Sequence, residues 1–137
     1  MGVDEITFSK NSPSKDDRSK VLGLVERGAR LCVKGGLEKN FKKLGMDPDL
    51  DSIEALNRAM VVIDCTPKGV GIENKNDFYL KLQNNVKGFL AQGSEEGFGK
   101  KYARGINDKA LLSKDKFIQV VSCNTHNIAS ITNTVGI

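Results

Sequence analysis

Five short apolar runs, separated by longer stretches of helix-like sequence, most constrain the fold of this chain. Each run has the length and the β-branched or aromatic content of a strand. The runs cover residues 5–8, 30–33, 60–64, 86–91 and 117–121. Because strands that alternate with helices form parallel sheets with helices on both faces, we expect an α/β chain with a partial doubly wound, Rossmann-like parallel sheet.

The stretches between the runs carry helix signals. We expect helices over residues 14–27, 37–44, 53–59, 74–82 and 94–104. Ser14, Ser52 and Ser94 stand at expected N-caps, and acidic residues follow Ser94 in what would be the first turn. A last helix is expected after residue 121, where cap-type polar residues follow the fifth apolar run.

Chain length and cysteine content limit the class of protein. A chain of 137 residues can bury one compact core, so one domain is the first expectation. The three cysteines have no metal-type spacing and His126 is the only histidine, so we expect reduced thiols and no metal site. No run approaches the ~20 apolar residues that span a bilayer, and the N-terminus has no secretory pattern. We therefore expect a cytoplasmic protein without a membrane partner.

The net charge of +4 raises the question of a nucleic-acid partner. The lysines are scattered, and the densest group is Lys39, Lys42 and Lys43. The sequence has no aromatic-basic motif of the RNA-binding kind. We therefore do not expect nucleic acid as the partner. Nonspecific RNA binding stays an alternative, and a local basic site for a phosphorylated ligand stays open.

Four of the expected strands run into short polar or small-residue segments. These segments are 9–12, 65–69, 92–94 and 122–125. In parallel sheets, ligands bind at the carboxyl ends of the strands. If the four strands are neighbours, the segments lie along one rim, which favours a cofactor-binding enzyme.

Cys123 lies where the last apolar run meets an expected helix start. Unpaired amide groups and the helix dipole at that position stabilise a thiolate, which is the form that attacks a carbonyl. The alternative is a small buried cysteine at a strand end, and most cysteines have such packing roles.

Three ordered motifs carry a resemblance to a known family. They are Val-Ile-Asp-Cys-Thr-Pro-Lys-Gly-Val-Gly at 62–71, Ala-Gln-Gly at 91–93 and Val-Val-Ser-Cys-Asn-Thr at 120–125, with a weaker Ser-Lys at 9–10. With these motifs in this order and at similar separations, the chain resembles the archaeal-type (type II), phosphorylating glyceraldehyde-3-phosphate dehydrogenases. The resemblance extends from residue 5 to about residue 128.

The resemblance implies an NAD(P)-dependent oxidoreductase. Its substrates would be a small phosphorylated aldehyde, glyceraldehyde 3-phosphate, and inorganic phosphate, with the aldehyde oxidised through a cysteine thioester. It implies that Cys123 is the nucleophile and that Ser122, Asn124 and Thr125 contact the substrate. The residues that it places at the cofactor are Lys10, Ser12, Thr66, Pro67, Gln92, Gly93 and Ser94.

The choice between NADP and NAD depends on the end of one strand. In doubly wound dinucleotide sites an acidic residue there binds the ribose 2'-hydroxyl, whereas a basic residue accommodates a 2'-phosphate. The first strand of this chain matches the family's second strand and ends in Ser9-Lys10. We therefore expect NADP to be preferred over NAD. A solvated lysine at position 10 is the alternative.

The sequence also departs from the family. It does not show the glycine-rich first strand, turn and helix or most of the catalytic domain, and His126 replaces a threonine. We expect a fragment or truncated relative, in which 1–121 form an incomplete dinucleotide-binding domain and 122–137 begin a catalytic domain. Strands without that neighbour would have unpaired edges, so we expect a homo-oligomer or a complementary segment as partner. The alternative function is a non-catalytic interaction or nucleotide-binding remnant of that fold.

Overall fold

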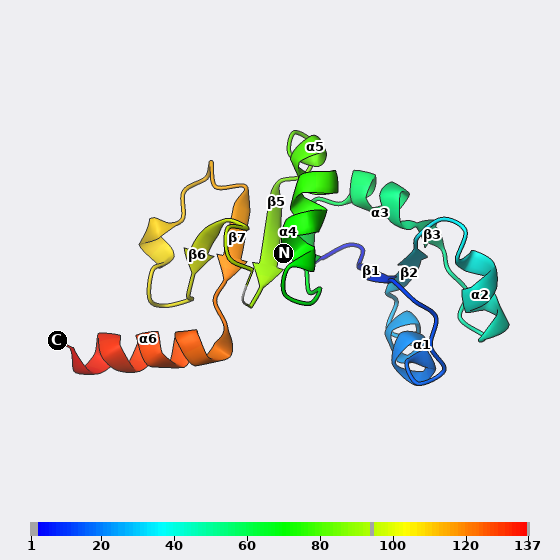
Figure 1. Ribbon diagram of the computed structural model, residues 1–137, viewed down its shortest axis with the longest axis horizontal. Helices are drawn as coiled ribbons and strands as arrows, with labels where there is room; N and C mark the ends of the chain where they lie inside the picture. The colour runs from blue at the N-terminus through cyan, green and yellow to red at the C-terminus, as the bar shows by residue number, and fades with distance from the viewer. Residues whose placement is uncertain (1–2, 94, 137) are drawn as a thin grey trace. The chain divides into compact units, whose positions relative to one another are not determined.

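The computed structural model describes residues 3–93 and 95–136. The chain divides into two compact units, Met1–Arg58 and Ala59–Ile137. Each unit contains a sheet whose paired strands are all parallel, together with helices (Figure 1). The α/β, partial Rossmann-like class predicted from the sequence is confirmed, although the strands form two sheets and not one.

Unit 1 is a three-stranded sheet with three helices. The strand order is β1-β2-β3, and the elements are β1 (Thr7–Lys10), α1 (Arg18–Glu26), β2 (Arg30–Val33), α2 (Glu38–Lys43), β3 (Leu50–Asp51) and α3 (Ser52–Arg58). Its core consists of buried Val21, Leu31, Val33, Phe41 and Met46. The central strand β2 therefore packs against side chains from α1 and α2, as expected for a sheet with apolar helix faces on it.

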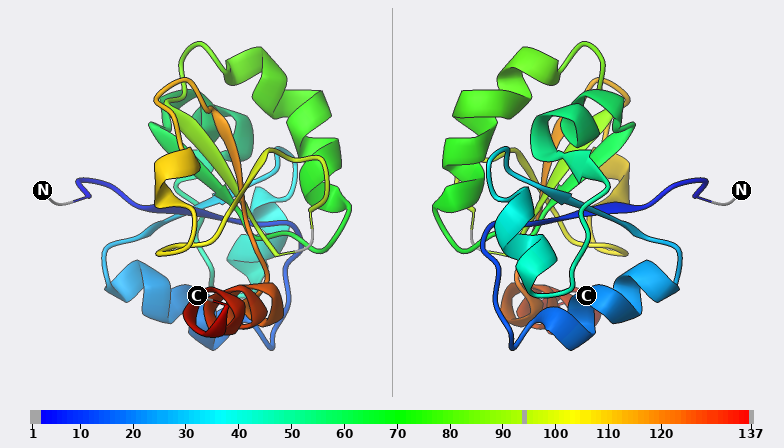
Figure 2. Two further views of the ribbon diagram at one scale, coloured as in Figure 1. Left: turned by 90° about the vertical axis from the view of Figure 1, so that its left-hand side faces the viewer. Right: turned by 90° about the vertical axis from the view of Figure 1, so that its right-hand side faces the viewer.

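Unit 2 is a four-stranded sheet with the order β4-β5-β7-β6. The strands are β4 (Val61–Asp64), β5 (Gly88–Gln92), β6 (Lys100–Tyr102) and β7 (Phe117–Val120). The helices are α4 (Val70–Asn74), the π-helix η1 (Lys75–Tyr79), α5 (Leu80–Leu82), the 3-10 helix η2 (Asp108–Ala110) and α6 (Cys123–Val135). Figure 2 shows α4, η1 and α5 as one continuous helical run, drawn in green.

An aromatic cluster forms the core of unit 2 on one face of its sheet. The Tyr79 ring of η1 stacks on Phe89 of β5 with centroids 5.0 Å apart, and Phe89 stacks on Phe117 of β7 at 4.8 Å. Phe98 meets Tyr79 and Phe117 edge-on. Such stacked and edge-to-face pairs add to the free energy of burial, so this cluster holds the helical run against the sheet.

The other face of the unit 2 sheet is apolar and partly exposed. Val61 and Ile63 are 50% and 66% exposed and share that face, because alternate residues of a strand point to the same side. They belong to β4, which is an edge strand of the sheet. This edge therefore presents aliphatic side chains and unpaired backbone groups together.

The helix predicted for 94–104 is wrong. The segment contains a turn and the short strand β6, which pairs with β7. Gly97 has a φ of 82°, which interrupts a right-handed helix. At Gly99 the backbone lies so close to the Phe117 carbonyl that a Cβ atom would be 2.1 Å from its oxygen. Tight pairing at β6 therefore prevails over the local helix signals.

Smaller differences concern the ends of other elements. The predicted N-cap at Ser14 is wrong, because α1 begins at Arg18 with Asp17 at the N-cap position. The first strand lies at Thr7–Lys10 and not at 5–8. The very short strand β3 has only two residues, too few for a periodic signal. The expected helix at 53–59 is present as α3, shifted by one residue.

Candidate functional site

Three of the four predicted rim segments meet at one edge of the unit 2 sheet. Strands β4, β5 and β7 are adjacent and parallel, with Asp64 opposite Ala91 and Gln92 opposite Val120. The segments that follow them therefore start at the same edge. The fourth segment, 9–12, follows β1 in unit 1 and does not belong to this sheet.

Cys123 is the first residue of α6, as the sequence predicts. Ser122 is the N-cap, and its hydroxyl oxygen accepts a hydrogen bond from the Thr125 amide at 3.3 Å. The Cys123 side chain is exposed, so the alternative of a buried packing cysteine is wrong. Its sulfur lies 3.9 Å from the side-chain oxygen of Asn124. The thiol is accessible at the amino end of a 13-residue helix.

The imidazole of His126 is held by the backbone and not by the thiol. Its Nε2 atom lies 3.0 Å from the carbonyl oxygen of Arg104. Because a carbonyl can only accept, Nε2 carries the proton in this contact. The ring is therefore attached to the segment after β6, which gives this residue a structural contact.

A pocket of ≈ 250 Å³ opens beside the start of α6. Predicted site residues Gly93, Ser122 and Thr125 line it, together with Lys68, Lys101 and Gln119. The Gln119 amide donates to the Gly93 carbonyl at 3.1 Å, while its buried Oε1 has no hydrogen-bond partner among the described residues. The pocket therefore joins the loops after β4, β5 and β7, with Cys123 adjacent in sequence to one lining residue.

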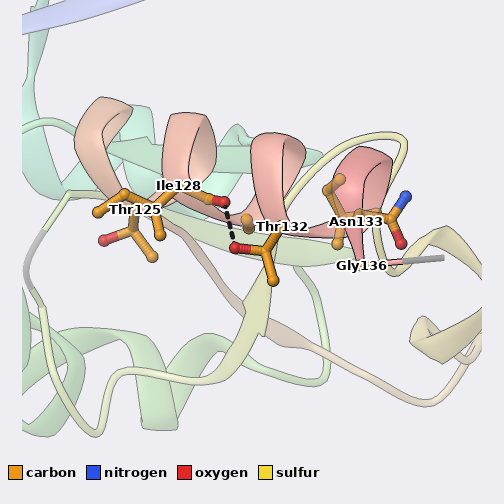
Figure 3. Close-up of a pocket in the computed structure, with 7 residues that line it drawn as sticks. Thr125, Ile128, Thr132, Asn133 and Gly136 are labelled. Carbon is orange, nitrogen blue, oxygen red and sulfur yellow. Dashed lines mark hydrogen bonds between the residues drawn. The ribbon is translucent and has the colours of Figure 1, made fainter.

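A larger groove of ≈ 640 Å³ runs along α6 (Figure 3). Ile128, Thr132 and Asn133 line it, and Ile106 forms part of its wall. The Thr132 hydroxyl donates to the Ile128 carbonyl at 2.9 Å, which satisfies that side chain within the helix. The groove lining is mainly apolar, and it includes the predicted site residue Thr125.

Asp64 organises the loop after β4, and the sequence analysis gave it no role. Its Oδ1 atom accepts hydrogen bonds from the backbone N–H of Thr66 at 2.9 Å and from the Thr66 hydroxyl at 2.5 Å. Its Oδ2 atom accepts hydrogen bonds from the side-chain amide of Asn74 at 3.0 Å and from the Tyr79 hydroxyl at 2.7 Å. Burial raises the pKa of Asp64, but these hydrogen bonds outweigh burial and bring the pKa below its ordinary value. Burial and the Asp64 carboxylate both raise the pKa of Tyr79. The network fixes Thr66, a predicted cofactor residue.

Lys10 lies at the end of β1 in an ion pair. Its ammonium group is 2.7 Å from the Asp17 carboxylate, and that hydrogen bond lowers the pKa of Asp17. The lysine is therefore neither a freely solvated side chain nor an unpaired cation. Ser12, the other predicted cofactor residue of this segment, is exposed.

The remaining predicted site residues have mixed surroundings. Thr66 is half-buried, whereas Pro67, Gln92 and Asn124 are exposed at the rim of unit 2. Ser94 lies outside the described residues. Among residues 3–93 and 95–136, no group of three or more acidic, cysteine or histidine side chains forms a candidate metal site. None of the helices in that part of the chain is long and apolar enough to cross a membrane.

The chain is similar to several curated glyceraldehyde-3-phosphate dehydrogenases. The glyceraldehyde-3-phosphate dehydrogenase of Methanobacterium bryantii is 28% identical over 137 aligned residues, which cover 90% of this chain and 40% of that protein. The enzyme of the same name from Pyrobaculum arsenaticum is 31% identical over 122 residues, covering 85% and 33%. That of Saccharolobus solfataricus is 37% identical over 113 residues, covering 80% and 32%.

These similarities confirm the resemblance predicted from the motifs. The chain is similar to archaeal glyceraldehyde-3-phosphate dehydrogenases over 80–90% of its length, and it spans 32–40% of the length of these relatives. No protein-family model matches the chain.

Proposed function

We propose that this partial relative of archaeal glyceraldehyde-3-phosphate dehydrogenases is an NAD(P)-dependent, glyceraldehyde-3-phosphate dehydrogenase-like oxidoreductase. The observation that carries the proposal is the exposed Cys123 thiol at the amino end of α6, next to the loops that follow β4 and β5. Its substrate is a small phosphorylated aldehyde, with inorganic phosphate as the second substrate.

The thiol supplies the nucleophile in this proposal. The Cys123 thiolate adds to the aldehyde carbon and forms a thiohemiacetal. Backbone amides in the first turn of α6 stabilise the negative charge on sulfur and, later, on the carbonyl oxygen. A bound nicotinamide ring supplies the hydride acceptor that takes the carbon to the acyl level. Phosphate then attacks the thioester on Cys123, and the acyl phosphate leaves with release of the thiolate.

Substrate contacts come from the residues around the nucleophile. Ser122 and Thr125 line the pocket beside Cys123, and Asn124 is exposed next to it. Lys68, Lys101 and Glu96 line the same pocket, and Lys101 pairs with Glu96 at 3.2 Å, so the lining carries one positive charge in excess. A phosphorylated ligand matches this charge.

The described residues of unit 2 fit the nicotinamide end of the cofactor. Thr66, Pro67, Gln92 and Gly93 would hold it, because they follow neighbouring strands at one edge. The sequence contains no Gly-x-Gly-x-x-Gly turn after a strand, so a pyrophosphate cradle has to come from elsewhere. We infer that a homo-oligomer or a complementary segment completes the site, that residues 1–121 form an incomplete dinucleotide-binding domain, and that residues 122–137 begin a catalytic domain.

We infer that NADP is preferred over NAD because Lys10 ends β1, where it is already paired with Asp17. A 2'-phosphate would compete with Asp17 for the ammonium group, which lies 2.7 Å from that carboxylate. Because a phosphate carries more charge than a carboxylate at neutral pH, Lys10 can exchange one partner for the other. NADP binding would then release Asp17. The proposed compartment for such an enzyme is the cytoplasm.

One observation favours the second candidate, a non-catalytic interaction or nucleotide-binding remnant. The imidazole of His126 is hydrogen-bonded to the Arg104 carbonyl, and the described residues show no hydrogen bond between this ring and the Cys123 thiol. If the protein is such a remnant, the loops at the strand ends still bind a nucleotide, but the Cys123 thiol is not an activated nucleophile.

Cysteine alkylation separates the two candidates. At neutral pH, iodoacetamide should modify Cys123 at least about tenfold faster than the exposed Cys65, which serves as the control thiol in the same molecule. Peptide mass spectrometry measures both rates. Equal rates would contradict an activated nucleophile, and NADP reduction with glyceraldehyde 3-phosphate and phosphate or arsenate tests turnover directly.

A further inference from the structure

Glu95 is a buried carboxylate with two backbone partners. Its side chain is 2% exposed, although it follows the exposed rim of the sheet. Oε1 accepts a hydrogen bond from the Gly69 amide at 2.6 Å, and Oε2 accepts one from the Ile72 amide at 3.2 Å. A buried carboxylate is costly without such bonds, so these amides hold the side chain in place.

The backbone around Gly71 is shaped to receive this carboxylate. A Cβ atom at Gly71 would lie 3.1 Å from both Cγ and Cδ of Glu95 and 3.2 Å from Oε2. Such contacts are tighter than ordinary van der Waals contacts, so a side chain at this position would push the Glu95 side chain a few tenths of an ångström away from its present place. The fit joins the segment after β5 to the segment after β4.

Hydrogen bonds from two other side chains, Gln119 and Lys75, hold the backbone on either side of Glu95. The Gln119 amide donates to the Gly93 carbonyl at 3.1 Å. The Lys75 ammonium donates to the Gly97 carbonyl at 3.1 Å and to the Phe98 carbonyl at 2.5 Å, and burial lowers its pKa. Gly93 is therefore attached to β7, and Gly97 and Phe98 are attached to η1. Glu95 attaches the segment after β5 to Gly69 and Ile72.

We propose that Glu95 is a positioning residue that locks the loops after β4 and β5 into one geometry for the nicotinamide dinucleotide. The inference rests on the proposed function, since these loops carry Thr66, Pro67, Gln92 and Gly93. Loops that are already ordered need not lose conformational entropy when a ligand binds, so the lock raises affinity. Glu95 acts through the loops and does not itself contact the ligand.

The main test is Glu95→Gln in the full chain, with Glu73→Gln as the matched control. The amide replaces one acceptor oxygen by a donor, so one of the two backbone bonds is lost while size and shape are kept. Glu73 is exposed on α4, and its substitution changes the side chain in the same way but leaves the two hydrogen bonds of Glu95 in place. Hydrogen exchange at the Gly69 and Ile72 amides and the dissociation constants of NADP and NAD are measured for both variants.

We expect Glu95→Gln to speed exchange at Gly69 or Ile72 about tenfold or more and to weaken dinucleotide binding by a similar factor. Glu73→Gln should change neither quantity. Gly71→Ala should reproduce both effects. In the double variant, Gly71→Ala should add little to the effects of Glu95→Ala on exchange and on dinucleotide binding, because the carboxylate that the added methyl group crowds is absent.

The outcomes separate the lock from the proposed function. Unchanged exchange in Glu95→Gln would overturn the lock. Faster exchange with unchanged dinucleotide affinity would overturn its role in ligand binding. If the wild-type chain binds neither NADP nor NAD at millimolar concentration, the proposed function fails and the ligand role of Glu95 fails with it, while the exchange rates still decide whether Glu95 holds the two loops together.

Discussion

Asp64→Asn should destabilise unit 2 by about 3 kcal/mol, because two part-buried or buried hydrogen-bond donors lose their acceptor. Oδ1 accepts two bonds from Thr66, and Oδ2 accepts one each from Asn74 and Tyr79. In the variant, an amide nitrogen that only donates takes the place of one oxygen, so two bonds are lost whichever oxygen it replaces. Hydrogen bonds to charged groups contribute roughly 1.5–3 kcal/mol each, and partial rearrangement lowers the sum.

A double-mutant cycle of Asp64→Asn with Tyr79→Phe tests whether the lost hydrogen bonds cause the destabilisation. The single change removes one donor and should cost about 1.5 kcal/mol, since the phenyl ring can still stack on Phe89. In the double variant the hydroxyl that would lack an acceptor is gone. The combined loss should therefore be about 1 kcal/mol smaller than the sum of the single losses. Urea unfolding, followed through the NMR signals of Phe89 and Ala91 in the central strand β5, gives the free energies.

The same network predicts how stability depends on pH. The pKa of Asp64 in the folded chain lies below its ordinary value of 3.8. Its contribution is therefore present at pH values above 3.8 and is lost as the pH falls through the lower folded value. The stability difference between the wild type and Asp64→Asn should shrink over that acid range. A difference below about 0.5 kcal/mol at pH 7, or one that stays constant on acidification, would refute the reasoning.

Three further predictions concern binding and assembly. Lys10→Glu should weaken NADP binding far more than NAD binding by calorimetric titration, and Asp17→Asn should strengthen NADP binding because it frees the ammonium group; equal effects on both cofactors would contradict the 2'-phosphate role. A peptide carrying a glycine-rich strand and turn should raise the melting temperature by scanning calorimetry, whereas an unchanged temperature would argue against an open strand site. Ile63→Lys should reduce self-association in sedimentation experiments, and unaltered sedimentation would place the interface elsewhere.

Much of the fold could be predicted from the sequence because its main signals are local. The central strands β2, β5 and β7 are runs of apolar residues, and the cap residue Ser122 marks the start of α6. These signals also placed Cys123 at a helix start. The division of the strands between two sheets depends on which strands pair, and pairing partners far apart in sequence leave no local pattern.

The errors have physical causes in tertiary contacts. The segment around Glu95 has the composition of a helix start, but its carboxylate binds the amides of another segment and the backbone at Gly99 packs on β7. Asp64 looked like the last residue of a strand, and only the folded chain brings Asn74 and Tyr79 to it. The Asp17 partner of Lys10 was likewise not expected, although the two residues are seven positions apart.

The two borders of the unit 2 sheet have opposite character. At one border β6 is only three residues long and carries Lys100 and Lys101, which discourages the approach of another strand. At the other border β4 offers aliphatic side chains. If two copies paired through their β4 strands about a twofold axis, each copy would cover the apolar edge strand of the other. Association would then end at a dimer and would not continue into a fibre.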